Sequence, residues 1–175
     1  NNFNPINCLY NDSSEVYWIA TTNGLIKYNT IDQKIKLLTE EHGLPNNHIY
    51  SILPDNKGNL WLSTNNGIAC YVPNEEVFRN FDISDNLQNN EFNTCAYMKS
   101  SDGDLFFGGI HGINYFNPSK IKQNSLPPKV VITGIKMENN YIHLSKKELE
   151  DRIFEIPSDI EMFMLEFTGL SFINI

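Results

Sequence analysis

A short motif occurs three times in this chain at an almost constant interval. The copies occupy residues 17–28, 60–71 and 105–116. Trp18 and Trp61 lie 43 residues apart, and the same interval separates Gly24 from Gly67. A period of about 40–45 residues is the length of one four-stranded β-propeller blade. Helical repeats of similar length would need apolar residues at a spacing of about 3.6, which is absent here. The repeat therefore predicts an all-β fold of consecutive blades.

The second copy shows how one blade is divided into strands. Turn-forming residues separate four apolar or β-branched runs. We expect strands at 48–53, 60–64, 68–72 and 77–81. Between the second and third strands, Asn65-Asn66-Gly67 predicts a type I′ hairpin turn, which requires positive φ angles.

The same pattern divides the whole chain. We expect propeller blades over residues 1–118, in units of about 6–45, 48–88 and 92–118, although the fourth strand of the third unit cannot be assigned. Residues 119–128 are rich in proline and are expected to be a linker. The repeat does not continue in residues 129–175. We expect strands there at 130–137 and 160–167, as in the N-terminal part of a truncated β-sandwich domain.

Some residues recur at equivalent positions for structural reasons. Large apolar side chains at one strand position are what packing between blades requires, and a glycine recurs at one turn position. The alternative for the tryptophans is stacking against a sugar, which the repetition disfavours. The structural repeat residues are Trp18, Gly24, Tyr28, Trp61, Gly67, Tyr71, Phe106, Gly112 and Phe116.

Three blades are too few to close a ring, because closed propellers have about four to eight. Open sheet edges and faces favour further pairing. We therefore expect a piece of a longer protein, and a homo-oligomer formed through the open blades or sheet edges.

Composition excludes several classes of function. The net charge is −8 with no basic stripe, which argues against nucleic acid or an anionic membrane surface as partner. No apolar run approaches the roughly 20 residues of a membrane span. Three cysteines without CxxC spacing predict buried thiols. We expect no catalytic residues, no metal and no cofactor. A metal site at His42 and His48 with Glu40 and Glu41 is the alternative to a solvated polar loop.

Blade topology predicts where a ligand would bind. The turn between strands two and three and the connection to the next blade emerge on the same side, here called the loop face. Its amides and imidazoles suit neutral or polyhydroxylated ligands. The alternative is that asparagine serves only turn geometry. Candidate ligand-binding residues are Asn23, His42, Asn46, Asn47, His48, Asn65, Asn66, Asn89, Asn90, Glu91 and His111.

These motifs resemble a known family. The pattern D-x-x-G-N-L-W-x-x-T-x-x-G-I at 55–68 resembles the two-component-regulator propeller repeat, and residues 107–118 resemble the last blade of such propellers. Residues 127–134 resemble the opening of the triple-tyrosine (YYY) domain that follows them, and 160–174 its next strands. This order is that of the periplasmic sensor region of hybrid two-component histidine kinases.

The resemblance implies a periplasmic, non-enzymatic sensor segment of an inner-membrane-anchored kinase. It would help detect oligosaccharides from glycan breakdown and relay the signal to transcription of utilisation genes. Membrane contact would come only through segments missing here. Two alternatives stay open: a propeller lyase or hydrolase acting on glycans, and a structural scaffold whose ligand site lies in other blades.

Overall fold

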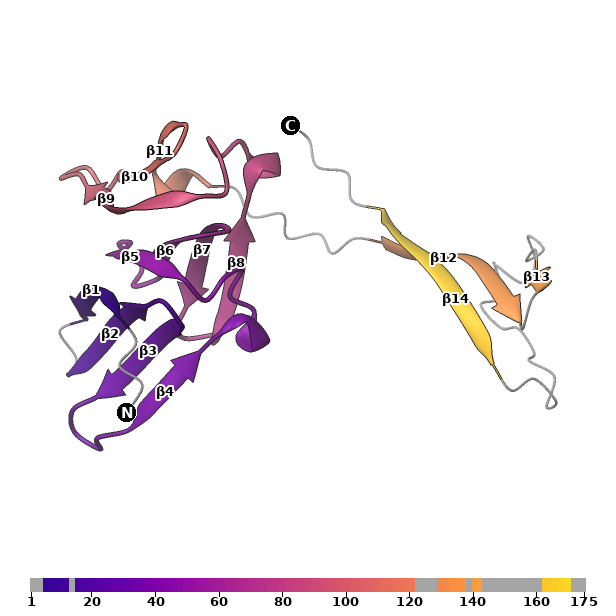
Figure 1. Ribbon diagram of the computed structural model, residues 1–175, viewed down its shortest axis with the longest axis horizontal. Helices are drawn as coiled ribbons and strands as arrows, with labels where there is room; N and C mark the ends of the chain where they lie inside the picture. The colour runs from indigo at the N-terminus through magenta and orange to yellow at the C-terminus, as the bar shows by residue number, and fades with distance from the viewer. Residues whose placement is uncertain (1–4, 13–14, 122–128, 138–139, 143–161, 171–175) are drawn as a thin grey trace. The chain divides into compact units, whose positions relative to one another are not determined.

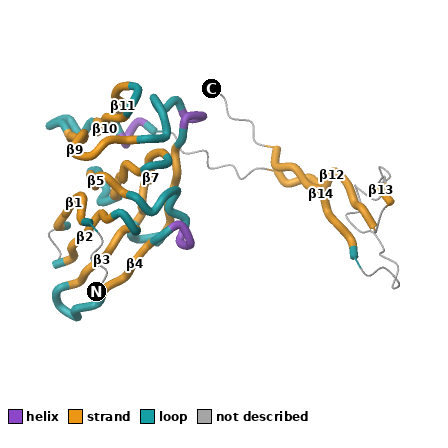
Figure 2. The backbone as a smooth tube through the Cα atoms, viewed as in Figure 1, coloured by secondary structure: helices purple, strands orange, loops and turns teal. Residues whose placement is uncertain are grey.

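The computed structural model describes residues 5–12, 15–121, 129–137, 140–142 and 162–170. The chain forms two compact units, Asn1–Ile121 and Lys122–Ile175, and each is described by itself. The described residues form strands, turns and three short 3-10 helices (Figure 2). No helix among them is both long and apolar enough to cross a bilayer.

The first unit begins with two antiparallel sheets of four strands each (Figure 1). In both, the strands pair in sequence order, as a propeller blade requires. The first sheet contains β1 (Ile6–Asn11), β2 (Val16–Thr21), β3 (Gly24–Asn29) and β4 (Ile35–Leu38). The second contains β5 (Ile49–Pro54), β6 (Leu60–Thr64), β7 (Gly67–Val72) and β8 (Val77–Phe81). The predicted all-β blade fold is confirmed.

The third sheet is smaller. Its strands are β9 (Phe92–Lys99), β10 (Leu105–Gly109) and β11 (Gly112–Phe116), in the order β11-β10-β9. Where a fourth strand would follow, the chain forms the 3-10 helix η3 (Pro118–Lys120). The expectation of about three four-stranded blades is therefore corrected to two four-stranded sheets and one three-stranded sheet among the described residues of the first unit.

The hairpin turns differ from the predicted type I′ geometry. In the second sheet, Gly67 has φ of 90°, but neither Asn65 nor Asn66 has a positive φ. The Thr64 hydroxyl donates to the Gly67 carbonyl at 2.9 Å, and Thr21 does the same to Gly24 at 2.8 Å. The left-handed residue is thus the glycine that opens the third strand, as in a type I turn followed by a glycine bulge.

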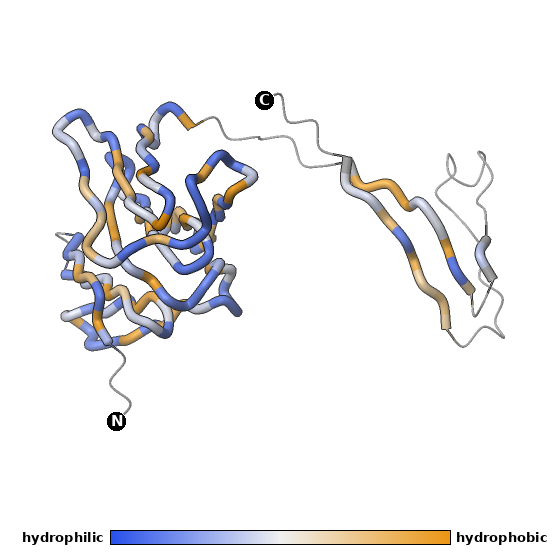
Figure 3. The backbone as a smooth tube through the Cα atoms, turned by 45° about the horizontal axis from the view of Figure 1, so that its top comes forward, coloured by the Kyte–Doolittle hydropathy of each residue, from blue (hydrophilic) through white to orange (hydrophobic). Residues whose placement is uncertain are grey.

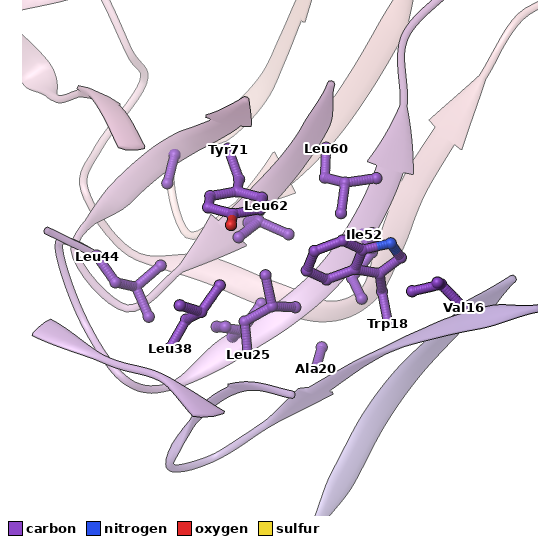
Figure 4. Packing of buried hydrophobic residues seen from close by; sticks show 12 residues of the cluster. Val16, Trp18, Ala20, Leu25, Leu38, Leu44, Ile52, Leu60, Leu62 and Tyr71 are labelled. Atoms are coloured by element: carbon purple, nitrogen blue, oxygen red, sulfur yellow. The ribbon is translucent and has the colours of Figure 1, made fainter. Parts of the chain in front are cut away.

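A first core lies between the first and second sheets (Figure 4). Trp18 is 1% exposed, and its ring meets that of Tyr71 edge to face at 5.4 Å. Leu25 and Leu38 from the first sheet point toward Leu62 of the second in the same view. Burying each large apolar side chain stabilises the fold by about 1.5–3 kcal/mol, so this contact holds the two sheets together.

A second core lies between the second and third sheets. In this core Trp61 occupies the position that Trp18 has in the first core. The centroid of its ring lies 4.9 Å from that of the Phe116 ring. Leu105 and Phe107 of β10 are fully buried here. Phe106, the third member of the repeated tryptophan position, is only half-buried and stacks on Tyr115 at 5.6 Å.

The second unit contains one described sheet of three strands. Its order is β13-β12-β14, from β12 (Lys129–Met137), β13 (Asn140–Ile142) and β14 (Phe163–Leu170). Apolar and polar stretches alternate along the long strands (Figure 3). β14 exposes Phe163, Leu165 and Phe167. The strands predicted at 130–137 and 160–167 are present with shifted ends, at 129–137 and 163–170, and residues 143–161 lie outside the described part.

Candidate functional site

The loop face is built by hairpin turns that hold the connections between sheets. The Gly24 amide donates to the Asn47 carbonyl at 2.7 Å, and the Gly67 amide donates to the Asn90 carbonyl at 2.6 Å. In the third sheet the Ile110 amide donates to the Glu91 carbonyl at 3.4 Å. Each hairpin turn therefore anchors the end of a connection. The loop face comprises residues 22–23, 39–48, 65–66, 82–91 and 110–111.

The two connections have the same internal architecture. Each begins with a 3-10 helix, η1 (Glu40–His42) or η2 (Ile83–Asp85). Each helix ends on a left-handed residue, Gly43 or Asn86. A side-chain carbonyl then closes the loop. The Asn47 carboxamide oxygen accepts from the Glu40 amide at 2.9 Å, and that of Asn90 accepts from the Ile83 amide at 2.9 Å.

In each connection, the asparagine that precedes this loop-closing residue also accepts hydrogen bonds from within its own loop. The Asn46 side-chain oxygen accepts from the His48 amide at 2.9 Å. The Asn89 side-chain oxygen accepts from the amides of Asn90 at 2.7 Å and Glu91 at 3.2 Å. Four predicted ligand-binding carboxamides thus use their acceptor oxygens to shape the loops.

Asn66 joins the two connections across the second sheet. Its side-chain nitrogen donates to the Pro45 carbonyl at 3.3 Å, and its side-chain oxygen accepts from the side-chain nitrogen of Asn90 at 3.2 Å. By contrast, the side chain of Asn23 is exposed on the first hairpin, where its backbone amide donates to the Thr21 hydroxyl at 3.0 Å.

Three loop-face residues, His48, Asn65 and Glu91, gather around Tyr50 of β5, and these four residues are here called the Tyr50 cluster. The rings of His48 and Tyr50 lie 4.5 Å apart with an interplanar angle of 36°. The Tyr50 hydroxyl donates to the Asn65 side-chain oxygen at 3.1 Å. Partial burial raises the pKa of Tyr50, and the negative charge of Glu91 raises it further. The cluster combines an aromatic surface with a carboxamide and a carboxylate.

Tyr50 was not among the predicted site residues, because only the first residue of the strand predicted at 48–53, His48, was assigned to the loop face. The signal was available, since residues i and i+2 of a strand share one face, which places Tyr50 beside His48. Gln88 was missed as well. Its side-chain oxygen accepts from the His111 amide at 2.7 Å, and its backbone amide donates to Asn114 at 2.9 Å.

The three histidines in the described part of the chain make separate contacts. His42 caps its own 3-10 helix, because its Nδ1 accepts from the Thr39 amide at 3.2 Å. His111 lies on the third hairpin with its Nδ1 2.9 Å from the Asn89 side-chain nitrogen. Among the described residues, no three His, Cys, Asp or Glu side chains are arranged to hold a metal ion.

The loop face carries only negative formal charge. Its carboxylates come from Glu40, Glu41, Asp82, Asp85 and Glu91, and its loops contain no lysine or arginine. Hydrogen bonds from the Ser84 hydroxyl and amide lower the pKa of Asp82. Such a surface disfavours anionic ligands at neutral pH.

Comparison with known proteins agrees with this geometry. Residues 43–66 match the two-component regulator propeller family. The chain is 28% identical over 146 residues to a histidine kinase (Histidine kinase P4) from Formosa agariphila, covering 79% of this chain and 11% of the kinase.

Two solved structures from B. thetaiotaomicron have a similar fold. One is the extracellular domain of a putative hybrid two-component system, with TM-score 0.68 and 30% identity over 94% of this chain and 23% of that one. Another such extracellular domain has TM-score 0.57 and 21% identity, over 78% of this chain and 20% of that one. The chain thus spans about a quarter or less of the length of these relatives. The predicted likeness to two-component sensor propellers is confirmed.

Proposed function

We propose that this chain, which carries two-component regulator propeller blades, is a segment of the ligand-sensing region of a hybrid sensor histidine kinase. The observation that carries this proposal is the likeness, over 94% of the chain, to the extracellular domain of a putative hybrid two-component system. The segment itself performs no catalysis. It works on the periplasmic side of the inner membrane, and the kinase chemistry belongs to other parts of the protein.

The ligand class we propose is a neutral oligosaccharide released by glycan breakdown. Support comes from the Tyr50 cluster, whose aromatic surface suits the apolar face of a sugar ring. Asn65 and Glu91 of the same cluster are exposed and offer hydrogen-bonding groups for hydroxyls. The absence of lysine and arginine from these loops favours neutral over sulfated or uronate-rich glycans.

Signal transmission would pass through the second unit. We propose that ligand binding shifts the equilibrium between two packing arrangements, and that the β13-β12-β14 sheet belongs to a YYY-like domain that relays the shift toward the membrane. A change in the geometry of a homo-oligomer is the form of relay we propose.

A structural scaffold is the second candidate, and one observation favours it. Four candidate carboxamides form side-chain hydrogen bonds that hold the loops in shape, namely those of Asn46, Asn47, Asn66 and Asn90. In that case the ligand would bind blades outside this segment. The two candidates differ in whether loop-face substitutions change affinity.

Titration calorimetry on the intact extracellular domain separates them. The titrants are the cello-, xylo-, manno- and laminari-oligosaccharide series, with sulfated oligosaccharides as the anionic comparison. Direct binding predicts that Tyr50→Phe and Asn65→Ala weaken binding of a neutral series several-fold. The matched controls Tyr17→Phe and Asn74→Ala leave it unchanged. Equal affinities for all four variants would support the scaffold instead.

A further inference from the structure

The inner strand of the third sheet, β9, carries an enlarged bulge. Pairing advances from Phe92 to Tyr97 on β9 while it advances only from Gly109 to Phe107 on β10. Four residues of β9 therefore lie opposite one residue of β10, and these four, residues 93–96, are here called the β9 bulge. At the same level of the first two sheets, two residues of the inner strand lie opposite one residue of its neighbour.

The interval of the sequence repeat changes at this bulge. His48 and Glu91, which end equivalent connections, are 43 residues apart. Gly67 and Gly112, which open the third strands that follow, are 45 residues apart. The two extra residues lie between these points, and the strand pairing places both in the β9 bulge. Bulges that interrupt a strand in this way often re-aim side chains beside functional sites.

The β9 bulge occupies the place in the third sheet that Tyr50 has in the second. Tyr50 is the residue of β5 without a partner on β6. Its counterparts in β9 are Asn93, Thr94 and Cys95. The strands β5 and β9 are neighbours in the first unit (Figure 1). Glu91 of the Tyr50 cluster precedes Asn93 by two residues, so the bulge starts beside that cluster.

The two ends of the bulge are fixed while its middle is exposed. Before it, Phe92 is 1% exposed and belongs to the second core. After it, the Tyr97 hydroxyl donates to the Cys8 thiol of β1 at 3.4 Å. Residues 93–95 between these anchors are all exposed. An exposed polar segment held by a rigid scaffold is the arrangement that binding loops commonly have.

The backbone is strained where it holds this shape. Cys95 has φ of 59°, a left-handed conformation that residues other than glycine seldom adopt. A Cβ at Gly108 would lie 2.9 Å from the Cβ of Ala96, so glycine is needed where the bulge rejoins β10. Backbone strain of this kind costs stability and is concentrated at functional sites.

The polar side chains of the bulge are not used to shape the loops. In the described part of the chain, neither the Asn93 carboxamide nor the Thr94 hydroxyl makes a hydrogen bond. The carboxamides of Asn47 and Asn90, by contrast, close their own connections. The donors and acceptors of Asn93 and Thr94 are therefore available to a ligand.

We propose that the β9 bulge is a second wall of the saccharide site, on which Asn93 and Thr94 select the sugar unit next to the one that contacts Tyr50. This inference rests on the proposed sensing of a neutral oligosaccharide. Stacked sheets lie about 10 Å apart, which is about the length of two linked sugar rings. A carboxamide and a hydroxyl offer both donors and acceptors to sugar hydroxyls. The site therefore takes a disaccharide or a longer chain in preference to a monosaccharide.

Titration calorimetry on the intact extracellular domain tests this second wall. The titrants are the monosaccharide and the longer members of the neutral series that binds. Asn93→Ala and Thr94→Val should each weaken binding of the disaccharide and longer members several-fold and leave the affinity for the monosaccharide unchanged. Tyr50→Phe should weaken binding of every member. The matched controls Asn74→Ala and Ser101→Ala remove the same groups from exposed turns and should change no affinity.

The outcomes separate this proposal from the proposed function. Unchanged disaccharide affinity in both bulge variants, with weaker binding in Tyr50→Phe, would overturn the second wall and leave the sensing function in place. Equal weakening of the monosaccharide and the disaccharide by the bulge variants would also overturn it, because no separate sugar position would then exist. An unmodified domain that binds no neutral series would contradict the sensing function and this proposal with it.

Cys95 gives a second measurement that needs no substitution. Its thiol is exposed within the bulge. A saturating concentration of the disaccharide should slow modification of Cys95 by iodoacetamide several-fold, as followed by mass spectrometry, whereas saturating monosaccharide should leave the rate unchanged. Modification of Cys95 at the same rate with and without bound disaccharide would contradict a ligand seated on the bulge.

Discussion

A Cβ atom on Gly67 would lie 2.2 Å from the carbonyl oxygen of Phe81. The hairpin of the second sheet therefore touches the end of its fourth strand so closely that only glycine fits. Because φ at Gly67 is also positive, replacement costs both backbone strain and displacement of β8.

Gly67→Ala should lower the free energy of unfolding of the first unit by more than about 3 kcal/mol, since left-handed strain alone costs about 1–2 kcal/mol. Gly58→Ala is the matched control, because φ there is 81° but nothing lies within 4 Å. Denaturant unfolding followed by circular dichroism measures both. Equal losses for the two variants would show that contact with Phe81 is unimportant.

The carboxylate of Asp55 makes the stability of the second sheet depend on pH. Burial raises its pKa, but hydrogen bonds from Asn59, the Trp61 ring nitrogen and the Lys57 amide outweigh burial and leave the pKa below its ordinary value. Its stabilisation is therefore present above the unfolded pKa of about 3.9 and is lost as pH falls through the folded pKa.

Asp55→Asn should flatten the fall in unfolding free energy between about pH 5 and pH 3. Asp102→Asn is the control, because Asp102 is exposed on the turn between β9 and β10. Urea titrations across this pH range provide the comparison. An unchanged slope in Asp55→Asn would contradict the role given to this carboxylate.

The three cysteines should react at different rates with a thiol reagent. Burial, and then the charge of Asp55, raises the pKa of Cys70 to about 12, so almost no thiolate is present at pH 8. Cys95 is exposed and Cys8 is half-buried, so the prediction of buried thiols is correct only for Cys70. In the native protein Cys95 should be modified first and Cys70 only after unfolding. Rapid native labelling of Cys70, located by mass spectrometry, would contradict the described core.

Asn90→Ala should destabilise the first unit by about 0.5–1.5 kcal/mol, because it leaves the Ile83 amide without its acceptor. Asn74→Ala, on an exposed turn, should change stability by less than about 0.5 kcal/mol. Thermal unfolding measures both. A neutral Asn90→Ala would mean that water replaces the carboxamide without cost.

The sequence predicted the blades well because their signal is repeated. Trp18 and Trp61 recur at one strand position, and turn residues bound each run, so strand ends agree within a few residues. The type predicted for the Asn65-Asn66-Gly67 turn is wrong, because the positive φ falls on Gly67 and on neither asparagine, and sequence spacing does not show which of the three residues adopts it.

The candidate site was harder to predict. Asparagine suits both ligand binding and loop closure, and only the contacts show that Asn47 and Asn90 close loops. Tyr50 was hidden in a strand pattern, and its link to Asn65 depends on two segments meeting in space. Burial of Trp18 followed from repetition, whereas no repeat marks the Tyr50 cluster.

Phosphorylation of the full-length sensor in membrane vesicles tests the central claim most directly. The neutral oligosaccharide series that binds the extracellular domain should change its autophosphorylation. Tyr50→Phe should need a several-fold higher concentration, while Tyr17→Phe responds like the unmodified sensor. Autophosphorylation that ignores every neutral series, or that responds identically in Tyr50→Phe, would contradict a sensing role for this loop face.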